Sequence, residues 1–409
     1  MTPPRVLTLI LAGGEGGRLD LLTARRAKPA MPFAGVYRLI DFVLSNCANS
    51  ALTDVWVLAQ YQPHALTEHL ANGRPWDLDR TFGGLRVLQP YLGRDESGWY
   101  QGNADALYRQ IGAIREFDPD LILVLSADHV YRLDYREVIE RHREAGAAVT
   151  IVATRVPREE AGQHGVVEVG DAGRVTGFAY KPDEPASDLI ATEVFLYDAA
   201  ALLDTLDALA DEADADAGAE DEGNDDGALA DFGDELLPRL VAAGRAREHR
   251  LDGYWRDVGT IESYFAAQLD LLGEDPAIDL DDPGWPFRTF ASQRPAARLV
   301  AGSSVADSLI GPGCLIQGRV IRSVLGPGVV VEAGATVRDA IVLQDARIAG
   351  GATVERAILD MHASVGAGAT VGAASDDPPS AETIALVGLR ATVAAGATVA
   401  PGGRVDPAG

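Results

Sequence analysis

Residues 331–371 of this 409-residue chain read VEAGATVRDAIVLQDARIAGGATVERAILDMHASVGAGATV, and this stretch decides the fold of the C-terminal part. Branched apolar residues recur in it at a spacing of six, with glycine and alanine between them. A longer spacing, of 17 residues, relates Val331, Ile348 and Val365. Hexapeptide repeats of this kind build a parallel β-helix, in which each coil stacks its inward residue on the coil before it. We therefore expect a left-handed parallel β-helix over residues 301–409.

The sequence before the repeats alternates between short apolar runs and segments of helical periodicity. The apolar runs predict buried strands, and the periodic segments predict helices. The predicted strands are 6–11, 55–59, 121–126, 149–154, 166–169, 175–180 and 194–197, and the predicted helices are 103–117 and 134–145. This alternation favours a Rossmann-like α/β domain with a mostly parallel sheet over residues 1–273, ending in an α+β subregion. A proline-containing linker, residues 274–300, would join it to the β-helix.

The composition excludes several classes of function. A formal net charge of -26 argues against binding to nucleic acid or to an anionic membrane surface. No apolar run reaches the ~18 residues that span a bilayer. The apolar run at residues 6–12 leads directly into glycines, so it predicts a strand and not a signal peptide. Cys47 and Cys314 form no disulfide framework or zinc pattern, and we expect a cytoplasmic protein.

The two lysines of the chain are candidates for specific chemistry. Of its 35 basic residues only Lys28 and Lys181 are lysines, and a compact ammonium is not interchangeable with a planar guanidinium. Lys28 follows a glycine-rich turn, residues 13–17, whose backbone N–H groups could approach a phosphate. With Arg18 it would form a cation cluster suited to a polyphosphate. A tight turn bordered by surface arginines is the alternative.

Two aspartates predict a metal site. Asp128 follows the predicted strand 121–126, at the sheet edge where open α/β proteins bind ligands, and Asp257 lies in the segment YWRDVGT, residues 254–260. Carboxylates beside phosphates would hold Mg²⁺, although Asp128 could equally cap a turn. The histidines show no zinc-binding spacing, and no nucleophile elbow is present. The acidic stretch 204–226, with 11 Asp or Glu in 23 residues, is interpreted as a solvated helix end and loop.

Several segments together resemble the nucleotide-sugar pyrophosphorylases, specifically the glucose-1-phosphate adenylyltransferases, or ADP-glucose pyrophosphorylases. They include LILAGG, RRAKPA, YRLIDFVLSNCANS, WYQGNADAL, SADHVYRLDY, YKP, YWRDVGTIESY and the repeats, and they cover nearly the whole chain. The resemblance implies that ATP and glucose 1-phosphate give ADP-glucose and pyrophosphate, for glycogen or α-glucan synthesis. Positioning and neutralisation of charge would do most of the catalytic work in such a transfer.

The resemblance also implies roles for individual residues. The implied catalytic residues are Arg18, Lys28, Asp128 and Lys181, the first two neutralising the pyrophosphate. The implied nucleotide contacts are Leu11, Ala12, Gly13, Gly14, Gln60, Gly102 and Asp128. The implied contacts to the sugar phosphate are Tyr100, Gly165, Tyr180, Lys181 and Glu193, and the implied Mg²⁺ ligands are Asp128 and Asp257.

Some positions depart from the pattern of this family. Tyr180 stands where the family has a glutamate before the sugar-phosphate lysine, and residues 190–193 read Ile-Ala-Thr-Glu where it has Ala-Ser-Met-Gly. Residues 88–91 read Leu-Gln-Pro-Tyr in place of Leu-Pro-Ala-Gln, and Gly17 replaces a threonine of the glycine-rich loop. The phosphate and metal positions are retained. We therefore expect a working nucleotidyltransferase whose sugar or nucleotide need not be that of the ADP-glucose enzymes.

Two further interpretations stay open. The chain could be a non-catalytic regulatory subunit, which the retained charged residues argue against, or its β-helix could be an acyltransferase with His362 as base. The resemblance itself implies a homotetramer, in which the β-helix serves subunit contacts. It also implies an anionic allosteric effector at the domain junction, with Arg25 as a candidate contact.

Overall fold

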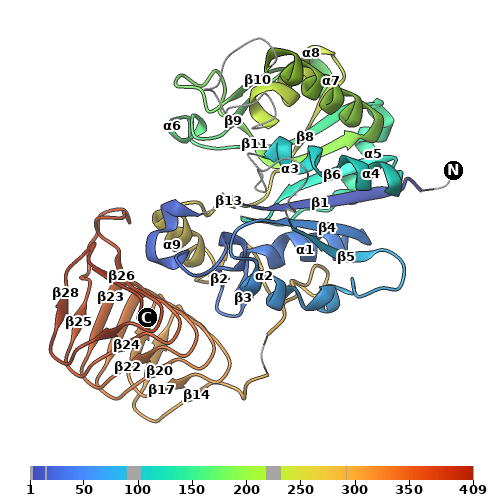
Figure 1. The fold of residues 1–409 in the computed structure, drawn as a ribbon. Coiled ribbons are helices and arrows are strands. Elements are labelled where there is room, and N and C mark those ends of the chain that lie inside the picture. The colour runs from blue at the N-terminus through green and yellow to red at the C-terminus, as the bar shows by residue number, and fades with distance from the viewer. Residues whose placement is uncertain (1–2, 14–15, 90–102, 218–231, 292, 409) are drawn as a thin grey trace.

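The computed structural model describes residues 3–13, 16–89, 103–217, 232–291 and 293–408 (Figure 1). Its N-terminal part is a sheet covered by helices, and its C-terminal part is a stack of short strands that lies beside α9 (Ile261–Leu269). Residues 270–297 connect the two parts, and the structure assigns no helix or strand to those of them that it describes. In the described part of the chain, no helix is both long and apolar enough to cross a membrane.

The N-terminal sheet has a parallel half that contains the first strand of the chain. β1 (Val6–Ala12) lies between β4 (Asp54–Ala59) and β6 (Leu121–Ser126), and β5 (Gly84–Leu88) follows β4 at the edge. All these neighbours are parallel, as expected for β1, β4 and β6, whereas β5 was not among the predicted strands. Alternate residues of β6 face different hydrophobic clusters, Ile122 and Val124 one of them and Leu123 and Leu125 the other. The sheet is therefore buried on both faces.

The other half of the sheet is largely antiparallel, which confirms the predicted α+β subregion. β11 (Leu189–Asp198) is antiparallel to β6 and to β8 (Val149–Arg155). The hairpin of β9 (Gly165–Val169) and β10 (Val175–Tyr180) extends this half, and β12 (Ala246–Arg250) pairs parallel with β8. β11 begins five residues before the predicted strand 194–197. The prediction missed its first half because the polar residues Thr192 and Glu193 interrupt the apolar pattern.

Helices cover the sheet, and one predicted helix is divided into two. The predicted helix 103–117 is two helices, α3 (Asn103–Tyr108) and α4 (Ile111–Phe117), separated at Arg109 and Gln110. Gly112, a poor helix former, lies just after the break. Asp134 caps α5 (Tyr135–Ala145) by accepting from the Arg136 N–H, as the predicted start at 134 implies. The remaining helices are α1 (Leu39–Asn49), α2 (Pro63–Leu70), α6 (Arg158–Ala161), α7 (Ala199–Ala217) and α8 (Leu237–Ala242).

Two small strand pairs lie beside the main sheet. β2 (Pro32–Phe33) pairs with β3 (Tyr37–Arg38), and β7 (His129–Tyr131) pairs antiparallel with β13 (Trp255–Asp257). In the second pair Asp257 stands opposite His129. This pairing brings the segment 254–260 next to the end of β6, although the two are far apart in the sequence.

The C-terminal part is a parallel β-helix of the hexapeptide type, consistent with the predicted left-handed form. Its strands are β14 (Arg298–Leu299), β15 (Ser304–Ala306), β16 (Leu309–Ile310), β17 (Leu315–Ile316), β18 (Arg319–Ile321), β19 (Val324–Leu325), β20 (Val330–Val331), β21 (Thr336–Val342), β22 (Arg347–Ile348), β23 (Thr353–Leu359), β24 (Ser364–Val365), β25 (Thr370–Val371), β26 (Ala385–Val387), β27 (Thr392–Val393), β28 (Thr398–Val399) and β29 (Arg404–Val405). Val331 pairs with Ile348, and Ile348 with Val365, so the 17-residue spacing is the length of one coil. The first strand, β14, lies within the predicted linker.

The two parts of the chain share a hydrophobic cluster. Phe42 of α1 and Phe265 of α9 belong to the same cluster as Ile341 and Ile358 of the β-helix. Beside it, both guanidinium nitrogens of Arg26 donate to the carboxylate of Asp360, at 2.8 and 3.0 Å, and both side chains are buried. The β-helix is therefore packed against the segment that precedes Lys28.

Candidate active site

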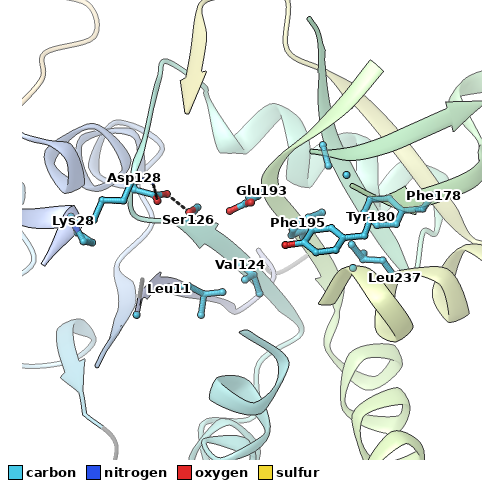
Figure 2. A pocket seen from close by; sticks show the side chains of 15 residues that line it. Leu11, Lys28, Val124, Ser126, Asp128, Phe178, Tyr180, Glu193, Phe195 and Leu237 are labelled. Carbon is cyan, nitrogen blue, oxygen red and sulfur yellow. Dashed lines mark hydrogen bonds and ion pairs between the residues drawn. The ribbon is translucent and has the colours of Figure 1, made fainter. Parts of the chain in front are cut away.

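A cavity of about 160 Å³ opens at the carboxyl ends of β1 and β6, where the parallel and antiparallel halves of the sheet meet (Figure 2). It is lined by Leu11, Gly13, Lys28, Pro29, Val124, Ser126, Asp128, Gly165, Phe178, Tyr180, Ala191, Glu193, Phe195, Gly233 and Leu237. Figure 2 shows charged groups at one end and the rings of Phe178, Tyr180 and Phe195 at the other. We call these the charged end and the aromatic end.

The charged end is organised around Lys28. Its Nζ lies 2.5 Å from Oδ2 of Asp128 and 3.3 Å from Oδ1 of Asp257, and the lysine is buried. Burial lowers the pKa of Lys28, but the two carboxylates outweigh burial and hold the pKa above its ordinary value. Burial likewise raises the pKa of Asp128, yet Lys28 and His129 outweigh it and leave that pKa well below its usual range. Lys28 and Asp128 are thus both charged at neutral pH.

Arg18 and Asp257 meet at Gly259, in the turn after β13. A Cβ atom placed on Gly259 would lie 3.1 Å from a guanidinium nitrogen of Arg18 and 3.1 Å from Oδ1 of Asp257. A side chain at this position would therefore push the two charged groups apart. The glycine of YWRDVGT lets a second cation stand close to the charged end.

The predicted nucleotide contacts gather at the end of β1. Leu11 and Gly13 line the cavity, and Ala12 pairs with Ala59 in the neighbouring strand β4. Gln60 follows that strand, and a Cβ atom on Gly13 would lie 3.8 Å from the Gln60 side chain. Backbone and amide groups are thus placed together at the carboxyl edge of the parallel half, where open α/β sheets bind ligands.

Two glycines make room for the rings of the aromatic end. A Cβ atom on Gly165 would lie 2.6 Å from Cζ of Phe178, and one on Gly233 would lie 2.4 Å from Cγ of Tyr180. Both contacts are too close for any side chain. The hydroxyl of Tyr180 accepts a hydrogen bond from Lys181 Nζ at 2.8 Å, so the second lysine reaches the rim of the cavity although it does not line it.

Glu193 and His129 lie beside Asp128 and Asp257 at the charged end. Glu193 lies where the register of β11 and β8 shifts, and its φ of 55° belongs to the left-handed region. The His129 ring is buried and its Nε2 lies 3.6 to 3.9 Å from carboxylate oxygens of Asp128, Asp257 and Glu193. Burial lowers the pKa of His129, but these carboxylates raise it further, above its ordinary value. Burial and the other carboxylates raise the pKa of Glu193.

The residues at the charged end can hold a divalent cation. Asp128, His129 and Glu193 each offer one donor atom, and these atoms lie within 4.8 Å of one another. Asp257, across the β7–β13 pair, adds a fourth donor beside them. Carboxylate oxygens suit Mg²⁺ and Mn²⁺, and the two aspartates together supply the negative charge that such an ion neutralises.

The predicted site residues fall into three groups. Seven of them line the cavity, namely Leu11, Gly13, Lys28, Asp128, Gly165, Tyr180 and Glu193. Five others, Ala12, Arg18, Gln60, Lys181 and Asp257, stand beside a lining residue or beside the charged end. Gly14, Tyr100 and Gly102 lie outside the described residues, as does Tyr91.

Several lining residues belong to no motif that predicted a role for them. Phe178 and Phe195 carry no motif, and the pattern of strands alone gives no reason to place two aromatic residues in a site. Ser126 donates to the carboxylate of Asp128 and could have been noticed from its place two residues before it. His129 could have been found in the same way, because it directly follows Asp128.

The comparisons with known proteins agree with this geometry. A family model described as nucleotidyl transferase matches residues 7–274, and one described as GlmU-like, C-terminal hexapeptide, matches residues 295–383. A relative from Thermomicrobium roseum is 46% identical over 312 residues, which are 76% of this chain and 70% of the relative. One from Thermotoga maritima is 43% identical over 81% of this chain and 76% of its own length. One from Clostridium acetobutylicum is 38% identical over 81% and 84%. Each of these relatives is named glucose-1-phosphate adenylyltransferase.

Proposed function

Because the chain belongs to the glucose-1-phosphate adenylyltransferases of the nucleotidyl transferase family, we propose that it makes ADP-glucose from ATP and glucose 1-phosphate. The observation that carries this proposal is the cluster of Lys28, Asp128 and Asp257 at the charged end of a cavity of about 160 Å³. Cations and metal-binding carboxylates at one end suit a polyphosphate, and the enclosed aromatic end suits a sugar ring.

The reaction is an in-line displacement at the α-phosphorus of ATP. A phosphate oxygen of glucose 1-phosphate forms a bond to that phosphorus, while the bond to the bridging oxygen of the β-phosphate breaks and pyrophosphate leaves. Negative charge grows on the leaving group during this step. Lys28 and Arg18 would neutralise it, since both stand at the charged end beside Asp257. Mg²⁺ held by Asp128 and Asp257 would supply further positive charge to the phosphates of the nucleotide.

Lys28 and the metal would share the same two carboxylates. The ammonium of Lys28 lies 2.5 Å from Asp128 and 3.3 Å from Asp257. Asp128 and Asp257 would therefore position the lysine for the phosphates as well as hold the divalent cation.

Lys181 would hold the phosphate of the sugar. It is exposed, follows the last residue of β10 and already donates to the phenol of Tyr180 at the rim of the aromatic end. Tyr180 and Glu193 would face the sugar hydroxyls, since both line the cavity. The match to the nucleotidyl transferase model ends at 274 and supports the proposed catalytic domain of 1–273. The proposed division between the linker, 274–300, and the β-helix, 301–409, comes later than the start of β14 at Arg298 and of the hexapeptide match at 295.

A homotetramer and an anionic effector are part of the same proposal. Exposed Arg25 lies next to Arg26, which is committed to Asp360 of the β-helix, so an anion bound at Arg25 would sit at the junction of the two parts. Size-exclusion chromatography with light scattering measures the oligomeric state. Activity of an Arg25→Ala variant with and without phosphorylated metabolites tests the effector site.

The deciding experiment is pyrophosphate release with Mg²⁺. ATP, UTP, dTTP, GTP and CTP are each tested against glucose 1-phosphate and other sugar 1-phosphates, and we expect ATP with glucose 1-phosphate to be the best pair. A second candidate, another sugar 1-phosphate, is favoured by Tyr180 and Glu193, which depart from the family pattern in the cavity itself. Preference for such a sugar would support that candidate. No release with any pair, and release only in a mixture with a catalytic homologue, would support a regulatory subunit.

A further inference from the structure

The orientation of the His129 ring is fixed by the backbone. Nδ1 lies 3.1 Å from the carbonyl oxygen of Thr192, and a carbonyl oxygen can only accept, so Nδ1 carries a hydrogen. The edge of the ring also packs against Trp255, with ring centroids 5.1 Å apart. In the neutral ring the lone pair is therefore on Nε2. Histidines that bind metals through one nitrogen commonly donate from the other to a backbone carbonyl in this way.

Nε2 of His129 points into a space between three carboxylates. It lies 3.6 Å from Oδ1 of Asp128, 3.8 Å from Oδ1 of Asp257 and 3.9 Å from Oε2 of Glu193. These distances are too long for hydrogen bonds. They do suit donors that share one ion, because two donors at about 2.0–2.2 Å from a metal lie at most about 4.4 Å apart.

Glu193 reaches this space through an unusual backbone. The register of β11 shifts between Ala191 and Phe195, and a bulge of this kind re-aims a side chain. The glutamate adopts a φ of 55°, where glycine would be free of strain, and its side chain lines the cavity. In Figure 2 the carboxylate of Glu193 lies toward Ser126 and Asp128 and away from the rings of Tyr180 and Phe178. The fold thus holds a strained residue with its carboxylate toward the other donors.

We propose that His129 Nε2 and the Glu193 carboxylate bind the same divalent cation as Asp128 and Asp257, which makes the centre a mixed nitrogen and oxygen site that binds Mn²⁺ more tightly than Mg²⁺. Mg²⁺ keeps most of its waters and takes one or two carboxylates, whereas an imidazole ligand favours a first-row transition ion. Four protein donors also allow the ion to bind before the nucleotide. This inference rests on the proposed function in one respect only, namely that the bound ion is the one that would supply positive charge to the phosphates of the nucleotide.

Electron paramagnetic resonance of Mn²⁺ added to the full-length, substrate-free protein tests the proposal. We expect one Mn²⁺ per chain, bound at least about tenfold more tightly than Mg²⁺ in competition, with a ¹⁴N coupling from the imidazole in pulsed spectra. His129→Ala should abolish the ¹⁴N coupling and weaken Mn²⁺ binding by about 10–100-fold. Glu193→Gly, which the backbone accommodates without strain, should weaken binding and keep the coupling.

His164 provides the matched control. Its ring packs against the same Trp255, with centroids 5.4 Å apart, but it forms no ion pair with Asp128, Asp257 or Glu193. His164→Ala should therefore retain both the affinity for Mn²⁺ and the ¹⁴N coupling. Circular dichroism of each variant verifies that it is folded.

The outcomes for this site and for the enzyme are separable. Absence of ¹⁴N coupling in the unsubstituted protein, or equal affinity in His129→Ala, would show that carboxylates alone bind the ion and would overturn the inference. Pyrophosphate release with Mg²⁺ would leave the proposed function standing in that case. If the ¹⁴N coupling is present but the protein releases no pyrophosphate, the inferred metal site would stand and the proposed function would fail.

Discussion

The two ends of the cavity are built by different physical means. At the charged end, two carboxylates hold the buried Lys28, so that Lys28, Asp128 and Asp257 each depend on the others. At the aromatic end, the rings of Phe178 and Tyr180 are held by packing against glycines 165 and 233. Removing one partner from a buried charge pair leaves the other uncompensated, whereas rings in a cavity can be exchanged for others at a lower cost. Tyr180, which departs from the family pattern, lies at the aromatic end, whereas Lys28, Asp128 and Asp257 at the charged end follow it.

The largest expected effect comes from breaking the charged end. Lys28→Met keeps the length of the side chain but removes its charge, and we expect kcat/KM to fall by about 10²–10³-fold, as when one preorganised donor to developing charge is lost. Pyrophosphate release measures it. Lys28→Arg serves as the comparison, because a planar guanidinium cannot replace the ammonium between two carboxylates and should also be poorly active. A near-normal rate in Lys28→Met would remove Lys28 from the catalytic centre.

A divalent ion should stabilise the folded chain through the same end. At an ion concentration of 100 times Kd, binding to the folded state alone adds about 2.7 kcal/mol to the free energy of unfolding. Thermal unfolding with and without Mn²⁺ after treatment with a chelator measures this. Asp257→Asn should lose most of the gain, since that carboxylate faces both Lys28 and His129. An equal gain in Asp257→Asn would place the ion elsewhere.

Breaking the aromatic end should have a smaller effect. Gly233→Ala places a Cβ atom 2.4 Å from Cγ of Tyr180, so the ring must move into the cavity. We expect KM for the sugar 1-phosphate to rise by about tenfold, the cost of one imperfect pocket contact, with kcat less affected. Gly112→Ala is the control, because a Cβ atom there meets no other atom within 4 Å. Equal kinetics in the two variants would argue that Tyr180 does not border the bound sugar.

The smallest expected effect comes from refining the aromatic end. Tyr180→Glu restores the residue that the family pattern has at this position, and we expect kcat/KM with glucose 1-phosphate to rise by several fold, about 1 kcal/mol, through a bond to a sugar hydroxyl. Tyr180→Phe, which loses only the acceptor of the Lys181 hydrogen bond, separates the effect of the carboxylate from that of freeing Lys181. Unchanged use of glucose 1-phosphate by Tyr180→Glu would count against a role for residue 180 in sugar recognition.

The charged end was more predictable from the sequence than the aromatic end. Lys28, Asp128 and Asp257 stand in local motifs whose position after a strand or turn already indicates an edge of the sheet. Their mutual distances could not be predicted, because the pairing of β7 with β13 joins segments more than 120 residues apart. The first half of β11 was missed for a local reason, since Thr192 and Glu193 interrupt its apolar run. The register shift that aims Glu193 leaves no mark in the sequence.

The β-helix was predicted in most detail because the six-residue spacing of branched apolar residues recurs along it. The 17-residue spacing of Val331, Ile348 and Val365 is the register of the folded strands. Its contact with the N-terminal part was not predicted. Arg26 and Asp360 are 334 residues apart in the sequence, and no repeat or motif around either residue indicates that they form a pair.

The Arg26–Asp360 pair also links the unfolding of the N-terminal part to that of the β-helix. Arg26 is two residues before Lys28, and its buried guanidinium has Asp360 as its partner on the β-helix. Loss of the β-helix would remove the partner of this guanidinium and would expose Phe42 and Phe265, whose burial stabilises both parts. We therefore expect heat to melt both parts in one cooperative transition. A proteolytic cut in the repeats would inactivate the enzyme, because it would loosen the segment that carries Lys28.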